Sequence, residues 1–346
     1  MLRVGIIGVS GYTGVELARI LANHPNVTLT LATSRQYEGR LLSEIYPNLK
    51  DCVDITCTNP SHDTLAKQAD FFFTAVPHKT AMAIVPPLLS EGKKVVDLSA
   101  DYRIRDVAIY EHWYQKHSSS ELINEAVYGL PELYRDSIKT ARLVANPGCY
   151  PTSVTLGLAP LLKKQIIDAE SIIIDSKSGT SGAGRSANLA TLYCEVADGF
   201  KAYNVGGTHR HIPEMEQELS VLAGEAVTIS FTPHLLPVSR GILSTIYVKN
   251  TGNATEAEIR SIYENSYLDE SFVRLCPAGT TPATQHVRGS NFCDIGFFLD
   301  PRTGRIIILS AIDNIGKGAA GQAIQNMNLM NGFDERTGLL GAPFFP

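Results

Sequence analysis

One cysteine and two histidines have the residue types and settings of a nucleophile with an acid/base partner. Cys149 lies in the segment Asn-Pro-Gly-Cys-Tyr-Pro-Thr, between a strand-like run and a run with helical spacing. His209 and His211 lie in the segment Gly-Gly-Thr-His-Arg-His, which opens a second helical run containing Glu214. We predict that Cys149 is the nucleophile and that His211 is the acid/base, oriented by Glu214. We expect His209 to contact the substrate.

The energetics of thiol ionisation call for such a histidine. A free thiol has a pKa of about 8.5, and only its thiolate is a nucleophile. Lowering that pKa to about 6 takes about 3.4 kcal/mol, and a helix N-terminus supplies only about 0.3–1 kcal/mol. The alternatives are a small buried cysteine, ordinary loop histidines, or a zinc half-site in His-x-His. We expect no metal, because no third ligand accompanies the two histidines.

A glycine turn joins the first predicted strand, at 2–8, to the first predicted helix, at 15–22. Its spacing is G-x-x-G-x-x-G, whereas the usual dinucleotide fingerprint is G-x-G-x-x-G. Glycines here allow a pyrophosphate to approach backbone N–H groups at a helix N-terminus, and nearby hydroxyl groups can add hydrogen bonds. The alternative is a turn that only links strand to helix. We predict that the following residues bind the phosphates: Gly8, Ser10, Gly11, Tyr12, Thr13 and Gly14.

The end of the second predicted strand indicates which dinucleotide is bound. A carboxylate at this point would hold the ribose hydroxyl groups of NAD. The chain instead has Ala-Thr-Ser-Arg, so Ser34 can hydrogen-bond and Arg35 can pair with a 2′-phosphate. We therefore predict NADP(H). The alternative is that Arg35 is a solvated loop residue.

Two further segments have the composition of binding sites. Residues 97–103 follow a predicted strand, where ligands bind in open α/β sheets, so Ser99 and Arg103 are candidates for substrate contact. The glycine-rich stretch 178–184 is either an anion-binding backbone or a mobile connection. On the first of these alternatives, Ser178 and Gly179 bind the cofactor.

The pattern of predicted elements favours an α/β fold with two domains. Strand-like and helical runs alternate through the first part of the chain, which is typical of a parallel sheet. From about residue 171 the strands follow one another more directly, which favours a mixed or antiparallel sheet. We predict a Rossmann-type dinucleotide-binding domain over 1–148, completed by a C-terminal helix at 316–346. An α+β catalytic domain would occupy 149–315.

Composition excludes several classes of protein. The 346 residues are 44% hydrophobic and 19% charged, which is typical of a globular chain and not of disorder. A net charge of −5 with dispersed basic residues argues against nucleic acid as a partner. We expect no membrane segment, since no apolar run approaches about 18 residues. Six scattered cysteines fit reduced thiols and a cytoplasmic location.

In their order along the chain, residues 8–14, 97–103, 146–152, 178–185, 209–214 and 313–323 resemble the N-acetyl-gamma-glutamyl-phosphate reductase family of arginine biosynthesis. More distantly, the chain is similar to aspartate-semialdehyde and glyceraldehyde-phosphate dehydrogenases. The resemblance implies NADPH-dependent reduction of an acyl phosphate to a semialdehyde and phosphate, through a thioester on Cys149. It also implies a homodimer or homotetramer assembled through the second domain.

The resemblance also implies roles for single residues. Asn314 would lie near the nicotinamide, and Asn146 would belong to the substrate site. Guanidinium groups bind planar oxyanions bidentately, so Arg103, Arg185 and Arg240 are the candidates for holding substrate carboxylates or phosphate.

Three other functions stay open at this point. One is reduction of the one-carbon-longer 2-aminoadipate 6-phosphate, presented on a carrier protein, because one methylene is worth only about 1–3 kcal/mol in a pocket. Another is a cysteine–histidine hydrolase or acyltransferase that uses no nucleotide. The third is a non-catalytic NADP-binding regulator.

Overall fold

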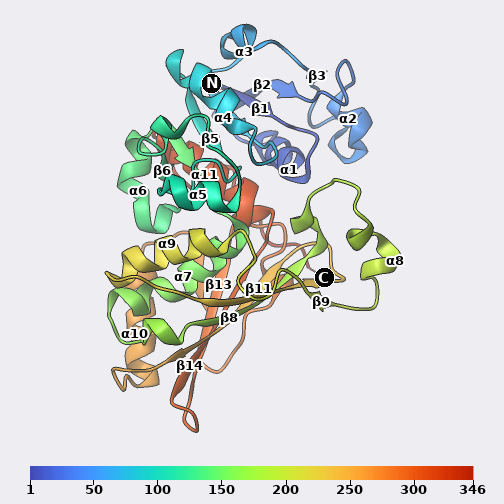
Figure 1. Cartoon of the computed structure of the whole chain (residues 1–346). Helices are drawn as coiled ribbons and strands as arrows, with labels where there is room; N and C mark the ends of the chain where they lie inside the picture. Colours follow the sequence, from blue (N-terminus) through green and yellow to red (C-terminus); the bar gives the residue numbers. More distant parts are fainter. Residues whose placement is uncertain (346) are drawn as a thin grey trace. The chain divides into compact units, whose positions relative to one another are not determined.

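The computed structural model describes residues 1–345, and it describes their side chains except those of His62 and Asp63. The chain forms two compact units (Figure 1). The first unit contains Met1–Pro147 and Ala319–Gly341, and the second contains Gly148–Gly318 and the residues from Ala342 onward. The chain passes from the first unit into the second between Pro147 and Gly148.

A fully parallel sheet of seven strands forms the centre of the first unit. Parallel strands covered on both faces are near-continuous apolar runs, as in Phe71-Phe72-Phe73, whose side chains are all inaccessible to solvent. In the order β3-β2-β1-β4-β5-β7-β6, the chain reverses direction across the sheet between β1 and β4. The strands are β1 (Leu2–Ile7), β2 (Val27–Thr33), β3 (Cys57–Thr58), β4 (Phe71–Thr74), β5 (Lys94–Asp97), β6 (Val127–Tyr128) and β7 (Leu143–Ala145).

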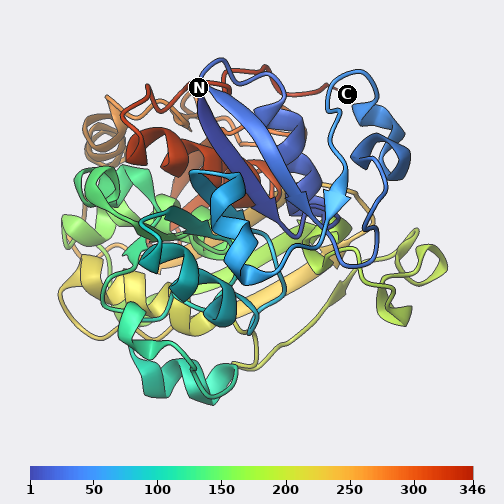
Figure 2. The same ribbon diagram turned by 90° about the horizontal axis from the view of Figure 1, so that it is seen from above.

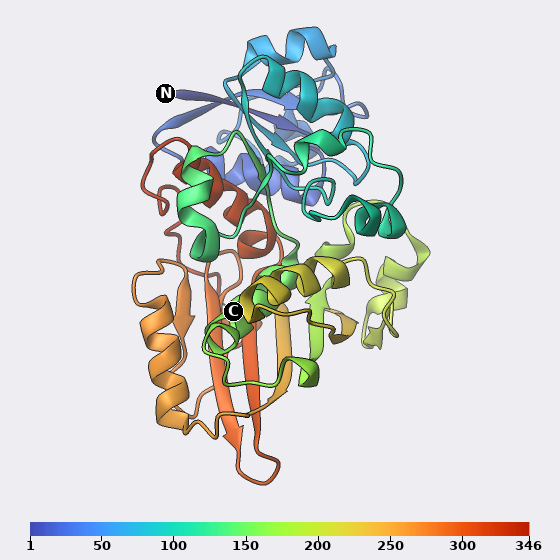
Figure 3. The same cartoon turned by 60° about the vertical axis from the view of Figure 1, so that its left-hand side comes forward.

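Helices follow most of these strands, which makes the first unit a doubly wound α/β domain (Figure 3). They are α1 (Tyr12–Leu21), α2 (Leu42–Ile45), α3 (His62–Gln68), α4 (Ala81–Ser90), α5 (Val107–Trp113), α6 (Pro131–Thr140) and α11 (Gly321–Met330), with single turns at η1 (Pro47–Leu49) and η2 (Ser120–Leu122). The predicted fold class is confirmed.

The C-terminal segment differs from the single helix predicted at 316–346. A π-helical turn, η7 (Gly316–Ala320), leads directly into α11, which ends at Met330. The helix stops there because Asn331 leaves helical geometry and Gly332 has a φ of 71°, a left-handed conformation that favours glycine. Every residue of α11 is buried, and the helix packs on α6 within the first unit.

A mixed sheet of seven strands, in the order β12-β13-β14-β11-β8-β10-β9, forms the second unit. The pairs β13–β14, β14–β11 and β11–β8 are antiparallel, whereas β8 and β10 are parallel. The strands are β8 (Ile173–Gly179), β9 (Lys201–Ala202), β10 (Ser230–Leu236), β11 (Ile242–Lys249), β12 (Val273–Leu275), β13 (Cys293–Asp300) and β14 (Arg305–Ile312).

The long helix α7 (Cys149–Lys163) lies against β11 and β14 and is flanked by α9 and α10 (Figure 3). Gly157 allows this close packing, since a Cβ there would lie 3.2 Å from the Ile246 side chain. The remaining helices are α8 (Tyr193–Val196), α9 (Ile212–Ala223) and α10 (Glu256–Tyr267), with turns at η3 (Ala169–Ser171), η4 (Thr180–Ala183), η5 (Leu189–Thr191) and η6 (Thr284–His286). Figure 2 shows α8 on a loop that extends away from this sheet. Across residues 1–345, no helix has the length and apolar character needed to span a bilayer.

The opposite face of this sheet carries an apolar row. Along β11, buried residues alternate with partly exposed ones, as expected for a strand with one face covered. In register across four neighbouring strands lie Ile173, Tyr247, Ile307 and Phe298, each partly or largely exposed. We call these four residues the apolar row.

Candidate active site

Cys149 is the first residue of α7, with Gly148 as the N-cap in extended geometry. The chain leaves β7 and turns at Asn146-Pro147-Gly148, and the Thr152 hydroxyl donates to the Gly148 carbonyl at 3.0 Å. Cys149 is partly exposed, whereas Cys57 and Cys293 are buried. A thiol at this position faces the positive end of a 15-residue helix, which favours its thiolate.

A backbone segment passes directly beside this cysteine. A Cβ atom at Gly318 would lie 2.8 Å from Cβ of Cys149, so a side chain at position 318 would force one of them to move. The Gly318 amide donates to the carbonyl oxygen of Asp313 at 2.9 Å, which fixes the turn. Glycine at 318 therefore sets how closely the backbone approaches the nucleophile.

Glu214 ties α9 to the start of α7. Its carboxylate is buried, with an exposed fraction of 1%, and its Oε1 accepts from the Gly148 amide at 2.7 Å. The amide of Gly148, the residue before Cys149, is therefore already hydrogen-bonded to a side chain of the protein. Orientation of His211 by Glu214 stays a prediction.

The two histidines differ in their surroundings. His209 is buried, and its Nδ1 accepts from the backbone N–H of His211 at 3.1 Å. Burial, with a smaller contribution from the charge of Arg210, lowers the pKa of His209 to about 4. His209 is therefore neutral near pH 7, with its proton on Nε2, while His211 is partly exposed.

Aromatic rings bring both imidazoles to the residue that follows Cys149. The Tyr150 ring meets the rings of His209 and His211 edge-on, with centroid separations of 5.5 and 5.9 Å. Tyr203 packs on His209 at 5.7 Å. The predicted catalytic residues thus come together within the second unit. Sequence reasoning missed the two tyrosines; proximity to Cys149 was the only signal for Tyr150, and Tyr203 had none.

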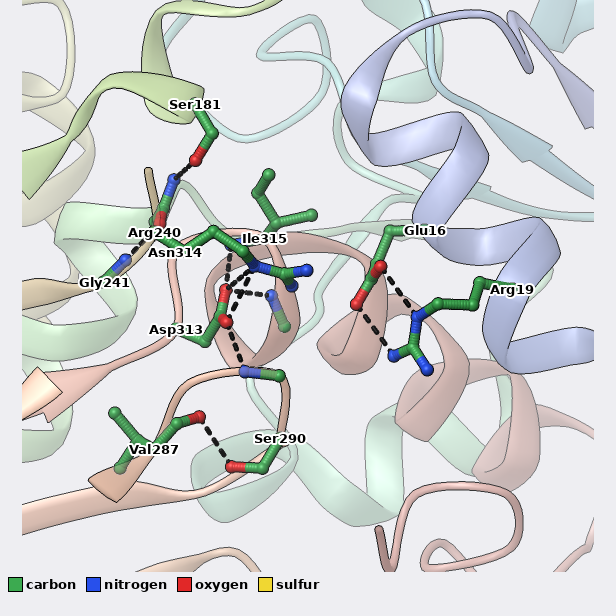
Figure 4. A network of polar contacts seen from close by, with 12 residues as sticks. Glu16, Arg19, Ser181, Arg240, Gly241, Val287, Ser290, Asp313, Asn314 and Ile315 are labelled. Carbon is green, nitrogen blue, oxygen red and sulfur yellow. Dashed lines mark hydrogen bonds and ion pairs between the residues drawn. The ribbon is translucent and has the colours of Figure 1, made fainter. Parts of the chain in front are cut away.

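Asp313 organises a second cluster in this unit (Figure 4). Its carboxylate is inaccessible to solvent and lies 2.9 Å from Nε of Arg240. It also accepts from the backbone amides of Gly289, Ile315 and Gly316. Sequence analysis nominated Arg240 for the substrate and overlooked Asp313. Nε of Arg240 faces Asp313, and this contact orients the guanidinium.

Three residues predicted to bind the cofactor, Ser178, Gly179 and Asn314, lie close together in this unit. The Oδ1 atom of Asn314 accepts from the Gly241 amide at 2.7 Å, and its Nδ2 donates to the Ser181 hydroxyl at 2.9 Å (Figure 4). A Cβ at Gly182 would lie 3.2 Å from Ser178 Oγ and 3.5 Å from Asn314 Nδ2. Ser178 and Gly179 end β8 beside this cluster, and Arg185 is exposed on the loop that follows it.

The three fingerprint glycines of the first unit have different requirements. Gly8 has a φ of 91°, and a Cβ there would overlap the carbonyl oxygen of Ala75. A Cβ at Gly14 would overlap the Gly8 carbonyl oxygen and lie 2.7 Å from Cα of Val9. At Gly11, the N-cap of α1, the nearest protein atom would be 3.9 Å away. The protein's own packing therefore requires glycine at 8 and 14, whereas position 11 has room for the close approach of a ligand.

The other predicted nucleotide-binding residues lie at the carboxyl ends of β1 and β2. Ser34 Oγ donates to Ser10 Oγ at 3.0 Å, and the Tyr46 hydroxyl, which sequence analysis missed, donates to the Ser10 carbonyl at 2.7 Å. Tyr12 and Thr13 open α1 and are not buried. Arg35 is exposed just after β2. This edge has the room, the amides and the cation that a dinucleotide phosphate needs.

Ser99, Arg103 and Asn146 are buried in the first unit. Arg103 donates from Nε to the Asn146 carbonyl at 2.7 Å and from Nη2 to the Leu98 carbonyl at 2.8 Å. The Asn146 side chain donates to the Ala319 carbonyl and accepts from Asn326. These bonds position Arg103 and use the Asn146 amide within the protein, and direct substrate contact stays a prediction.

Ser99 belongs to a buried acidic network. Its hydroxyl donates to Asp97 Oδ2 at 2.7 Å, and Thr74 donates to the other oxygen at 2.5 Å. Burial, together with the charge of nearby Asp101, raises the pKa of Asp97 to about 6. Within residues 1–345, no three histidine, cysteine or acidic side chains are grouped so that they could hold a metal ion.

Comparison with known proteins decides the family. Residues 3–141 match the model described as "Semialdehyde dehydrogenase, NAD binding domain", and residues 149–314 match "Semialdehyde dehydrogenase, dimerisation domain". Proteins named N-acetyl-gamma-glutamyl-phosphate reductase from Desulfotalea psychrophila and Geobacter metallireducens are each 60% identical over 346 residues, covering 100% of both chains. The chain belongs to the N-acetyl-gamma-glutamyl-phosphate reductase family.

Solved structures of other semialdehyde dehydrogenases share this reductase family's fold. Aspartate semialdehyde dehydrogenase II from Vibrio cholerae has a TM-score of 0.73 at 16% identity, covering 96% of this chain and 98% of that one. The aspartate semialdehyde dehydrogenase from Candida albicans has a TM-score of 0.66 at 14% identity, covering 96% and 98%. The resemblance inferred from the sequence is confirmed.

Two alanine substitutions in the glycine turn of this reductase separate a packing role from a ligand-binding role. Gly14→Ala forces a methyl group into backbone atoms, so we expect a loss of about 1–3 kcal/mol in stability. Gly11→Ala enters open space and should change stability by less than about 0.5 kcal/mol. It should raise KM for the dinucleotide about tenfold or more, because the methyl group displaces phosphate from backbone donors. Urea unfolding and steady-state kinetics measure the two effects; an unchanged KM in Gly11→Ala would remove the ligand role of this position.

Proposed function

We propose that this chain reduces N-acetyl-gamma-glutamyl phosphate to N-acetylglutamate 5-semialdehyde and phosphate, using NADPH, in arginine biosynthesis. The observation that carries the proposal is a partly exposed Cys149 at the start of α7, with two imidazoles packed on the next residue. Relatives 60% identical over the full chain are named for this reaction. Because the nucleophile must stay reduced, we place the enzyme in the cytoplasm.

The first chemical step forms a covalent acyl-enzyme. The Cys149 thiolate attacks the acyl carbon, a carbon–sulfur bond forms, the bond to the phosphate oxygen breaks, and inorganic phosphate leaves with its electron pair. The helix N-terminus and an imidazole stabilise the thiolate. We assign that imidazole to His211, because a pKa of about 4 keeps His209 neutral throughout the physiological range.

The second step is reduction of the thioester. Bound NADPH supplies the hydride that the thioester carbon accepts. Hydride addition leaves a thiohemiacetal alkoxide, which re-forms the carbonyl as the carbon–sulfur bond breaks and releases the aldehyde. His211 then supplies the proton that converts the Cys149 thiolate to the thiol. His209 stays a candidate for substrate contact through its Nε2–H, since its Nδ1 is already bonded to the His211 amide.

Cofactor binding is proposed for two sets of residues. In the first unit, Gly8, Gly11 and Gly14 with Ser10, Tyr12 and Thr13 would hold the pyrophosphate, and Ser34 and Arg35 the 2′-phosphate of NADP(H). In the second unit, Ser178, Gly179 and Asn314 would face the nicotinamide part. The open space at Gly11 and the exposed guanidinium of Arg35 support this assignment.

Substrate anions are assigned to the three arginines. Arg103 is held in place by two backbone carbonyls, Arg240 is held by Asp313, and Arg185 is exposed. Held guanidinium groups bind carboxylate or phosphate with little loss of side-chain entropy. Ser99 and Asn146 would support this site through their buried networks.

Replacement of the nucleophile tests the mechanism. Cys149→Ser should lose turnover by at least about 10³-fold while still binding NADPH, because serine is far less ionised than cysteine. The assay measures phosphate-dependent NADPH formation from the semialdehydes of N-acetylglutamate, 2-aminoadipate and aspartate, and titration of NADPH fluorescence reports binding. Preference for the 2-aminoadipate compound would reassign the substrate, and wild-type turnover in the serine variant would end the mechanism.

The choice of NADP(H) over NAD(H) depends on Arg35. Arg35→Ala should raise KM for NADPH by about tenfold, the expected effect of losing a hydrogen bond between charged groups, and should leave KM for NADH nearly unchanged. Arg40→Ala is a matched control, since Arg40 is an exposed arginine on the same loop. Equal effects of Arg35→Ala on both cofactors would contradict the assignment.

We further propose that a second copy of the chain covers the apolar row, giving a homodimer or a homotetramer built from such dimers. An exposed row of Ile173, Tyr247, Ile307 and Phe298 spans four strands of the region that matches a dimerisation domain. An identical copy related by a two-fold axis can pair such a face with itself.

Introducing a charge into the middle of this row should break the assembly. Ile307→Lys is expected to yield monomers at micromolar concentration, since a buried unpaired charge costs several kcal/mol. Val221→Lys, on the exposed surface of α9, is the control and should keep the wild-type mass. Light scattering after size-exclusion chromatography measures the mass. A monomeric wild type, or an unchanged mass in Ile307→Lys, would refute this interface.

A further inference from the structure

Tyr203 stands at the start of the loop that carries the two histidines. It directly follows β9, and its backbone N–H donates to the Pro233 carbonyl on β10 at 3.1 Å. The loop then turns through left-handed conformations at Asn204, Gly206 and Gly207 before it reaches His209. Residues 204–208 are exposed, so the position of the loop depends on the residues at its ends.

The Tyr203 side chain connects this loop to the cysteine helix. Its hydroxyl lies 2.8 Å from the hydroxyl of Tyr150, which is 2% exposed and directly follows Cys149. Burial, as the main cause, raises the pKa of Tyr203 to about 12 and that of Tyr150 further. Both phenols therefore stay neutral, and one donates a hydrogen bond to the other.

The same two rings hold the histidines. Tyr203 packs on His209 with centroids 5.7 Å apart and an interplanar angle of 62°, and Tyr150 packs on His209 at 5.5 Å and 86°. His209 in turn accepts from the backbone amide of His211. A continuous series of contacts therefore runs from the Tyr203 hydroxyl to the backbone of His211. A negative charge on Cys149 also contributes to the raised pKa of both tyrosines.

We propose that Tyr203 is a positioning residue, which holds the His209–His211 loop against the cysteine helix through its hydroxyl bond to Tyr150. The proposal rests on the proposed roles of Cys149 and His211. Without that bond, the loop keeps its backbone anchor at Pro233 and the ring contacts with Tyr150, but it loses a contact that helps to fix the imidazole of His211 relative to the sulfur. A displacement of about 1 Å at such a site costs up to about 10²-fold in rate.

Tyr203→Phe removes the hydroxyl and keeps the ring. We expect kcat to fall by about 10- to 100-fold with KM for NADPH unchanged, because the residues assigned to the pyrophosphate and the 2′-phosphate belong to the other unit. The pH profile of Cys149 alkylation by iodoacetamide, followed on its peptide by mass spectrometry, should shift to higher pH, since the thiolate loses imidazole support. Tyr193→Phe is the control: it removes a phenol hydroxyl that is 82% exposed in α8 and should match the wild type in both measurements.

A second variant separates positioning from simple loss of stability. Tyr150→Phe breaks the same bond from the other side, so the double variant Tyr150→Phe/Tyr203→Phe should be no slower than the slower single variant. Multiplicative losses, a wild-type alkylation profile in Tyr203→Phe, or a fall in kcat that only tracks the unfolded fraction in thermal melts would each overturn the proposal. The alkylation profile does not depend on turnover. The role of Tyr203 can therefore be refuted while the reductase mechanism stands, and the reductase mechanism can be refuted while the role of Tyr203 stands.

Discussion

The proposed chemistry depends on stabilising a negative charge on the sulfur of Cys149 at a place that a substrate can reach. Burial opposes ionisation of a thiol, and full exposure leaves its pKa too high for much thiolate to form near neutral pH. The second unit meets both demands by starting a long, buried helix at Cys149, so that the helix body is fixed while its first residue stays partly exposed. The positive helix end contributes part of the stabilisation, and the histidine loop packed on Tyr150 is placed to contribute the rest.

Glycine makes close approach possible in both units. At Gly8 and Gly14 the chain packs against its own backbone, and at Gly318 it packs against the nucleophilic residue. Gly11 differs, because a side chain at this position would not clash with any atom of the protein. The same residue type is therefore required by internal packing at Gly8 and Gly14 and leaves open space at Gly11, where we propose that a ligand approaches. The sequence alone does not distinguish the two cases.

Patterns that are local in sequence predicted much of this molecule. The β2 strand begins and ends where its β-branched run does, and the Gly-Cys-Tyr-Pro-Thr segment begins a helix as expected. What local patterns miss is set by distant partners. Two-residue strands such as β6 and β9 exist only because a neighbouring strand pairs with them. The hydrogen bond between Tyr150 and Tyr203 joins residues 53 positions apart. The carboxylate of Asp313 accepts hydrogen bonds from the amides of Gly289 and Ile315, and no sequence pattern connects these two segments. The end of α11 at Met330 was missed because a single glycine conformation decides it.

The chain returns to the first unit only after Gly148–Gly318, which is nearly all of the second unit, and this has a consequence for synthesis on the ribosome. The first 147 residues emerge without α11, every residue of which is buried in the finished structure. Until residues 319–341 are translated, the nascent first unit exposes the apolar surface that α11 will cover, while Gly148–Gly318 has all but the last few residues of its own unit. Folding of the two halves is thus out of step with the order of their translation: the half made first is the last to close its core.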